Sequence, residues 1–178
     1  VDAIIKFLYP PQTGKVTQYT KQLQKTRNEI AKLSALSNGA TKLSLGKNVQ
    51  AVEREACRIL GSKYSTFITN ATAGFEIANR FAGLGPGDEI IIPAITFIAT
   101  MLYPLSIGAK VVLADVDKRT LNLDPKDVAR KITKKTKVIM PVHIGGYPVD
   151  MAPIMKLAQK HNITVIEDAA HAFGGQYK

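Results

Sequence analysis

The sequence predicts an α/β domain with a largely parallel, doubly wound sheet, preceded by a helical arm. Two observations predict this class. From about residue 65 onward, segments with strand patterning alternate with segments of helical periodicity. Most of the expected strands are almost continuously apolar or β-branched, as is typical of strands buried on both faces of a parallel sheet. These strands read EIII, KVVLA, KVIMPV and ITVI.

The first part of the chain is predicted to be helical. Residues 16–37 have a thin apolar stripe at helical spacing, and residues 49–60 form an amphipathic helix that Gly61 stops. We therefore expect one α/β domain preceded by a helical arm. Residues 1–41 form a basic helical arm, and residues 42–178 form the α/β domain.

Strands and helices then alternate in order along the domain. The expected strands lie at 65–69, 89–92, 110–115, 137–142 and 163–166. The expected helices lie at 72–82, 96–106, 125–132 and 151–161. Asp124 and Asp150 are expected to cap the last two helices, and Pro104 to bend or end the second. The glycine-rich stretch GLGPGD precedes a strand and follows a helix, so it is predicted to be a turn and not a dinucleotide-binding loop.

The composition is that of a folded globular protein. Hydrophobic residues make up 46% of the 178 residues and charged residues 21%, which excludes disordered and fibrous classes. No run of 18 apolar residues is present, so no membrane span is expected. The N-terminus shows no basic leader, and the single cysteine, Cys57, suits a reducing compartment. We expect a cytoplasmic location.

The net charge of +10 is concentrated at the N-terminus. Residues 1–50 contain eight Lys and Arg but only Asp2 and Glu29 as acids. A basic arm can bind nucleic acid, bind an acidic ligand, or present a solvated helix face. Its lysines have no interleaved aromatic residues and match no DNA-binding motif, so a solvated face is the favoured interpretation.

Three stretches at the predicted carboxyl ends of strands are candidates for chemistry, because open α/β sheets bind ligands there. They are TNATAG, PAITF and EDAAH. In TNATAG, 69–74, small residues leave backbone N–H groups uncovered at a helix start, which favours a phosphate or another anion. The alternative is an ordinary capped turn, with Asn70 or Thr72 as the cap.

The last of these stretches, EDAAH, ends a buried strand with two acids. A carboxylate such as Asp168 is costly to bury without a partner. A protonated heterocyclic nitrogen, a metal or an arginine would serve, and the alternative is that Asp168 caps the following turn. His143 and His171 do not have the spacing of metal ligands, so no metal site is expected.

Taken together, several motifs resemble the DegT/DnrJ/EryC1/StrS family of pyridoxal-phosphate-dependent sugar aminotransferases. They are TNATAGFEIA, GPGDEIIIPAITFIAT, GAKVVLADVD, TLNLDP, PVHIGGYPVDM and VIEDAAHAFGGQYK. The resemblance runs from about residue 45 to residue 178. It implies the large domain of the aspartate-aminotransferase type (fold type I), of which residues 42–178 would be the N-terminal part, and pyridoxal 5'-phosphate as cofactor.

The resemblance also assigns the cofactor phosphate to the first motif. Ala71, Thr72 and Ala73 would supply backbone and hydroxyl contacts to it. Two residues depart from the family pattern, which usually has Gly in place of Ala71 and Ala in place of Gly74. A methyl group at position 71 would crowd the phosphate without abolishing its binding.

Three further residues are assigned by resemblance. Phe97 would stack on the pyridine ring. Asp168 would bind the pyridine nitrogen and keep it protonated, so that the ring draws electrons from the substrate carbon. His171 matches a position near the phenolic oxygen of the cofactor.

The Schiff-base lysine of the family has no counterpart here, because it follows the EDAAH stretch at a distance that lies beyond residue 178. Lys178 matches a surface position of the family. We therefore expect the chain to be the N-terminal part of a longer protein and to be inactive by itself.

For the whole protein, the resemblance implies transfer of an amino group, with glutamate as the expected donor, to a nucleotide-linked keto-sugar. It also implies a homodimer. Two alternatives stay open. One is a sugar dehydratase, in which another base replaces the lysine. The other is a non-catalytic regulatory protein of the same fold, which only the basic arm favours.

Overall fold

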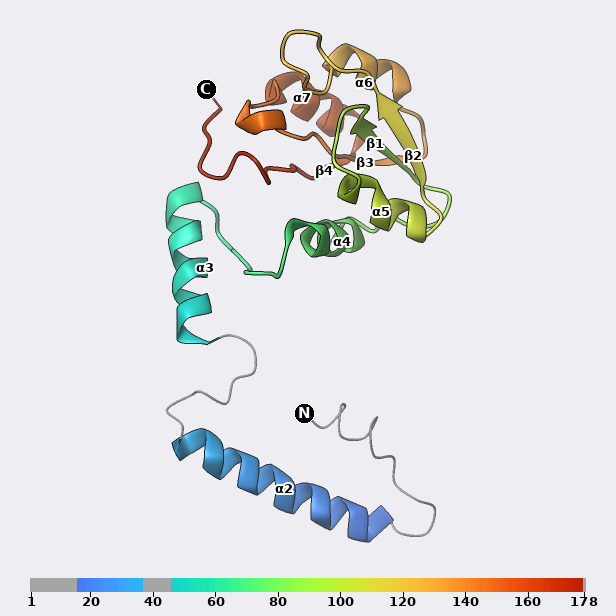
Figure 1. Ribbon diagram of the computed structural model, residues 1–178. Coiled ribbons are helices and arrows are strands. Elements are labelled where there is room, and N and C mark those ends of the chain that lie inside the picture. Colours follow the sequence, from blue (N-terminus) through green and yellow to red (C-terminus); the bar gives the residue numbers. More distant parts are fainter. Residues whose placement is uncertain (1–15, 37–45, 178) are drawn as a thin grey trace. The chain divides into compact units, whose positions relative to one another are not determined.

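A computed structural model describes residues 16–36 and 46–177. The chain divides into two compact units, Val1–Phe67 and Ile68–Lys178. The first unit contains helices α2, Val16–Leu36, and α3, Lys47–Leu60 (Figure 1). Both confirm predicted helices. The predicted stop at 37–39 lies outside the described residues.

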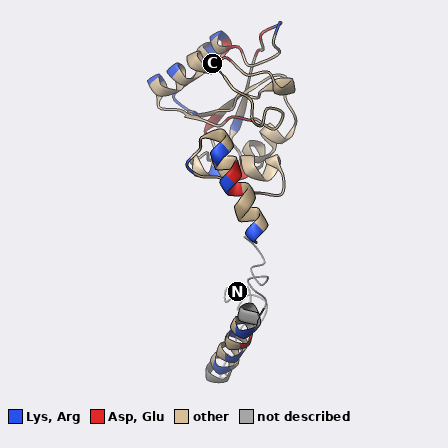
Figure 2. Cartoon of the chain, turned by 90° about the vertical axis from the view of Figure 1, so that its left-hand side faces the viewer, with Lys and Arg blue, Asp and Glu red and all other residues tan. Residues whose placement is uncertain are grey.

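Helix α3 ends where the sequence predicts. Gly61 has a φ of 63°, in the left-handed region that glycine occupies without a steric penalty. Helix α2 has four basic residues, Lys21, Lys25, Arg27 and Lys32, against one acid (Figure 2). No described helix is long and apolar enough to cross a membrane.

The predicted strand at 65–69 is wrong. These residues are irregular, and within this stretch the N–H of Phe67 donates to the Glu53 carboxylate, 2.9 Å away. The segment STFIT has the residue types that strands favour, but a strand also needs a neighbouring strand for its hydrogen bonds. None of the four described strands pairs with it.

The second unit contains a four-stranded parallel sheet with helices on both faces (Figure 1). Its strands are β1, Glu89–Pro93; β2, Lys110–Ala114; β3, Thr136–Ile139; and β4, Thr164–Val165. Its helices are α4, Ala71–Phe81; α5, Ala99–Ser106; α6, Pro125–Lys131; and α7, Met151–His161, with a short 3₁₀ turn η1, Ile144–Gly146. The parallel, doubly wound class is confirmed.

The strand order β2-β1-β3-β4 creates a switch point between β1 and β3. From β1 the chain crosses to β2 on one side, then returns past β1 to β3 and continues to β4. Right-handed crossovers in opposite directions place their helices on opposite faces of the sheet. In such sheets the ligand crevice lies outside the carboxyl ends of the strands that flank the switch point.

Two apolar clusters show which helices cover which face. Ile90, Ile92, Val138 and Met140 pack with Phe75 of α4 and Met101 of α5. Ile91 and Ile139 pack on the other face, with Val128 of α6 and Ile154 of α7. All five residues of β1 are buried, as the apolar run EIII predicts for a central strand.

Side-chain capping is seen at the start of α6 but not at the start of α7. The Asp124 carboxylate accepts from the N–H of Lys126, as predicted, and Pro125 follows at the first helical position. Asp150 occupies the N-cap position of α7, but its side chain makes no capping hydrogen bond there. Its carboxylate instead accepts from the Tyr177 hydroxyl, so the capping contact predicted for Asp150 is wrong.

A buried carboxylate joins α6 to the end of β2. Asp127 is 5% exposed and accepts from the N–H of Asp115 at 2.6 Å, with Arg130 and Lys131 at 2.8 and 3.0 Å. The hydrogen bond from Asp115, followed by that from Lys131, lowers the pKa of Asp127 to about 2. The carboxylate therefore stays ionised well below neutral pH.

Candidate active site

The first candidate element is the start of α4. The Asn70 side chain accepts from the N–H of Ala73 at 2.9 Å, which makes Asn70 the N-cap. Among the described residues, neither the N–H of Ala71 nor that of Thr72 has an acceptor, and both residues are exposed. No acid lies in the first turn. With the helix dipole behind them, these two N–H groups can bind an anion.

The Asn70 cap gives a direct stability prediction. Asn70→Ala should lower the free energy of unfolding by about 1 kcal/mol, because the N–H of Ala73 loses its acceptor. Urea denaturation measures this change. Asn70→Asp is the matched control and should keep the stability within a few tenths of a kcal/mol, since its carboxylate accepts the same bond. Equal stability of wild type and Asn70→Ala would show that the cap contributes nothing.

Gly74, where the family pattern usually has Ala, has a local packing reason in this chain. A Cβ atom built on Gly74 would lie 2.7 Å from Cδ1 of Ile68. Because Gly74 has no methyl group, the Ile68 side chain fits beside the first turn of α4. The glycine at this position therefore accompanies the isoleucine at position 68.

Phe97 lies between the carboxyl end of β1 and the start of α5. Its side chain is 71% exposed, although its backbone is fixed by the hydrogen bond from the N–H of Thr100 at 3.1 Å. The Thr96 and Thr100 hydroxyl groups, 2.7 Å apart, hold the same turn. An exposed aromatic ring on an anchored backbone offers a flat face for stacking.

Asp168 lies at the carboxyl end of β4 and is 4% exposed. Its backbone extends the pairing of β4 with β3: its N–H donates to Pro141 O at 2.9 Å, and its carbonyl accepts from the N–H of His143 at 3.0 Å. Oδ1 accepts from the N–H of Ala170 at 3.1 Å, which is the turn-capping contact considered above. Among the described groups, none donates to Oδ2, which leaves an acceptor for a ligand.

The sheet places the carboxylate on the same face as α4 and α5. Side chains two residues apart on an extended strand point to one face. Ile166 packs against the cluster covered by α4 and α5, so Asp168 shares that face. Phe97 follows β1 and Asp168 lies beside the end of β3, so both belong to the edge of the sheet at the switch point.

The two histidines have separate environments. His171 is exposed, whereas His143 is 7% exposed and hydrogen-bonded through both ring nitrogens. No three His, Cys, Asp or Glu side chains within the described residues form a metal-binding group. His171 lies on the turn that follows β4, three residues after Asp168.

Sequence patterns did not reveal the polar links that hold the loop after β3. The amide of Asn122, a buried residue, donates to Tyr147 O at 2.9 Å and accepts from the N–H of Ile144 at 3.1 Å. Nε2 of His143 lies 3.1 Å from Oε2 of Glu167, which is 24 residues away in the sequence. The only signal for either link was a polar residue within an otherwise apolar stretch.

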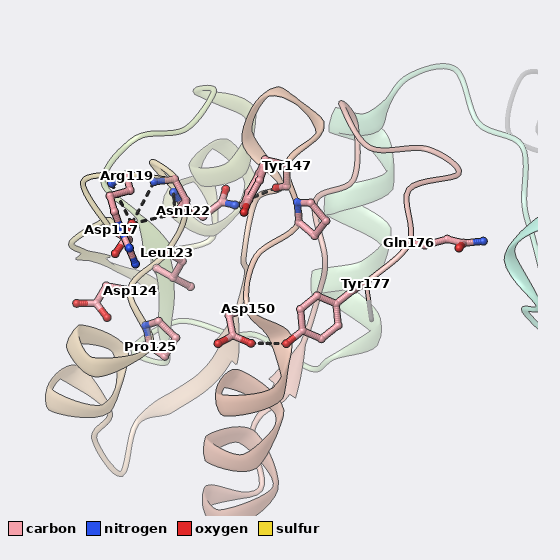
Figure 3. A pocket seen from close by; sticks show the side chains of 12 residues that line it. Asp117, Arg119, Asn122, Leu123, Asp124, Pro125, Tyr147, Asp150, Gln176 and Tyr177 are labelled. Atoms are coloured by element: carbon pink, nitrogen blue, oxygen red, sulfur yellow. Dashed lines mark hydrogen bonds and ion pairs between the residues drawn. The ribbon is translucent and has the colours of Figure 1, made fainter.

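Figure 3 shows a separate cavity of about 500 Å³. Tyr147 and Tyr177 line it together with the loop before α6 and the start of α7, near Asp124 and Asp150. None of the site residues expected from the sequence lines this cavity. The candidate site therefore comprises the start of α4, with its uncovered N–H groups, and the sheet edge that carries Phe97 and Asp168.

Comparison with known families agrees with the motifs. The model of the DegT/DnrJ/EryC1/StrS aminotransferase family matches residues 23–178. The match begins upstream of the point where the motifs start and includes part of the basic arm.

Three solved structures are similar to this chain. A 3-amino-5-hydroxybenzoic acid synthase is 42% identical over 72% of this chain and 34% of its own, with a TM-score of 0.71. An aminotransferase from Psychrobacter cryohalolentis is 36% identical over 94% of this chain and 40% of its own, with a TM-score of 0.74. The third structure is a mutant GDP-4-keto-6-deoxymannose-3-dehydratase, ColD, with bound GDP-perosamine. It is 26% identical over 75% of this chain and 36% of its own, with a TM-score of 0.71. The chain thus spans less than half the length of each.

Proposed function

This chain belongs to the DegT/DnrJ/EryC1/StrS aminotransferase family, and we propose that the whole protein transfers an amino group to a nucleotide-linked keto-sugar. The single observation that carries the proposal is the placement of Asp168 on the sheet face that α4 and α5 cover. Members of this family use pyridoxal phosphate. The proposed assembly is a homodimer, by family resemblance. The proposed location is cytoplasmic, because the single cysteine, Cys57, suits a reducing compartment.

The residues of the candidate site fit the cofactor. The free N–H groups of Ala71 and Thr72 suit its dianionic phosphate, and Ala73 continues this first turn of α4. The exposed ring of Phe97 suits its planar ring. The free oxygen of buried Asp168 suits its pyridine nitrogen, because a carboxylate there accepts from a protonated ring nitrogen.

Each side chain then has a defined task. Asp168 holds a proton on the ring nitrogen, which is favoured because the carboxylate is shielded from water. Phe97 covers one ring face and excludes water, and Thr72 adds a hydroxyl donor beside the phosphate. His171 is proposed to lie near the phenolic oxygen. When bound, pyridoxal phosphate supplies an electron-withdrawing ring that stabilises negative charge on the substrate carbon.

The substrate class is proposed from the relatives. The ColD structure contains a GDP-linked amino sugar, which supports a nucleotide sugar as the acceptor in this family. Glutamate is the proposed amino donor by family resemblance.

An isotope assay tests this function. The full-length protein, incubated with [15N]glutamate, pyridoxal phosphate and a panel of nucleotide-linked keto-sugars, should yield a 15N-labelled amino sugar and 2-oxoglutarate, as measured by mass spectrometry. Absence of label in every sugar, with cofactor bound, would exclude sugar amination.

The alternative is dehydration of the sugar, which the similarity to ColD favours. The same assay separates the two functions. A dehydratase yields a deoxy product that has lost an oxygen and carries no 15N, whereas an aminotransferase yields a labelled amine.

A further inference from the structure

The inference starts from the protonation state of His143. The N–H of Val149 donates to Nδ1 of His143 at 3.1 Å, and Nε2 lies 3.1 Å from Oε2 of Glu167. Since Nδ1 accepts a hydrogen bond, it carries no proton. The neutral ring must therefore bear its proton on Nε2 and donate it to Glu167.

The loop that contains His143 is held at both of its ends. The side chain of His143 accepts a hydrogen bond from the N–H of Val149. The side chain of Asn122 is hydrogen-bonded to the backbone of Ile144 and Tyr147. Gly146 has a φ of 83°, and a Cβ atom built on it would lie 3.0 Å from the carbonyl oxygen of His171. The loop thus lies directly against the turn that carries His171.

The same loop also contacts the strand that carries Asp168. Val142 lies opposite Asp168, and the N–H of His143 donates to the Asp168 carbonyl. Because side chains alternate along a strand, Glu167 points to the His143 side and Asp168 to the opposite face. The bond between His143 and Glu167 therefore restrains the rotation of the backbone just before Asp168.

We propose that His143 is a positioning residue, which acts through Glu167 to aim the Asp168 carboxylate at the cofactor's pyridine nitrogen. This role rests on the function proposed above. A histidine that only fills the core would stabilise the fold but would leave the orientation of Asp168 unchanged. The two possibilities differ in whether the hydrogen bond from Nε2 of His143 to Glu167 affects the orientation of Asp168.

Two variants separate the two ring nitrogens. In His143→Asn, the amide oxygen can still accept from Val149, but the shorter side chain does not reach Glu167. In His143→Gln, the amide nitrogen can still donate to Glu167. Amide hydrogen exchange of the full-length protein without cofactor gives the first measurement, because the N–H of Ala170 donates to Oδ1 of Asp168.

The expected result is about tenfold faster exchange at Ala170 in His143→Asn, and exchange close to wild type in His143→Gln. Glu167→Ala should reproduce the effect, and the double variant His143→Asn with Glu167→Ala should be no worse than either single variant. Unchanged exchange at Ala170 in His143→Asn, or equal changes in both His143 variants, would overturn the role.

Cofactor binding gives the second measurement. Pyridoxal phosphate should bind His143→Asn about tenfold more weakly than wild type, and the 15N shift of its pyridine nitrogen should move toward the unprotonated value. If wild type itself bound no pyridoxal phosphate, the proposed function would fail, whereas the exchange at Ala170 would still decide the role of His143.

Discussion

Asp168→Ala in the full-length protein should lower the rate of amino transfer by at least roughly 100-fold, the scale seen when one preorganised electrostatic partner is removed from an active site. Without the carboxylate, the ring nitrogen of the cofactor loses the group that keeps it protonated. The affinity for pyridoxal phosphate should also fall. Single-turnover absorbance measurements follow the first effect and cofactor titration the second.

Asp168→Asn is the control for this prediction. Its amide keeps the size of the side chain and can accept from Ala170, but it does not carry the negative charge that holds the proton. The rate should therefore fall nearly as much as in Asp168→Ala, while the thermal stability of the apoprotein changes less. Full activity in either variant would contradict the role proposed for Asp168.

Asp127→Ala should have the largest effect on stability among the polar residues, at about 2 kcal/mol of unfolding free energy. The N–H of Asp115 loses its acceptor. Arg130 is mostly exposed and Lys131 is half-buried, so the lost ion pairs add little. Urea denaturation at pH 7 measures the loss.

The pH dependence provides an independent check. The pKa of Asp127 is lowered to about 2 in the fold, from an ordinary value of 3.8. A lowered pKa stabilises the fold above pH 3.8, and this contribution is lost as the pH falls toward 2. Wild type should therefore lose more stability between pH 4 and 2 than Asp127→Asn, which has no charge to titrate. Parallel acid curves for the two proteins would contradict the assignment.

The sequence predicted most helices and strands because their signals are local. Asp124 and Asn70 cap helices through side chains that reach two or three residues along the chain. Asp150 has the same local pattern, but Tyr177, 27 residues away, takes its carboxylate. The segment 65–69 has strand propensity, and the absence of a pairing partner among the described strands outweighs it. A distant contact decides the first case, and the lack of one among the described strands decides the second.

The site could be predicted only in part for the same reason. The motifs indicate an anion site at the start of one helix and a buried acid after a strand, but they do not give the strand order. The order β2-β1-β3-β4 places Phe97 and Asp168 at one switch point. The contact of His143 with Glu167 depends on the pairing of Val142 with Asp168, which no local pattern encodes.

A crystal structure of the full-length protein with pyridoxal phosphate tests the central claim most directly. We predict that the phosphate accepts from the N–H groups of Ala71 and Thr72 and that Phe97 stacks on the ring. We also predict that the pyridine nitrogen lies about 3 Å from a carboxylate oxygen of Asp168. A phosphate bound away from the start of α4, or a ring nitrogen without contact to Asp168, would contradict it.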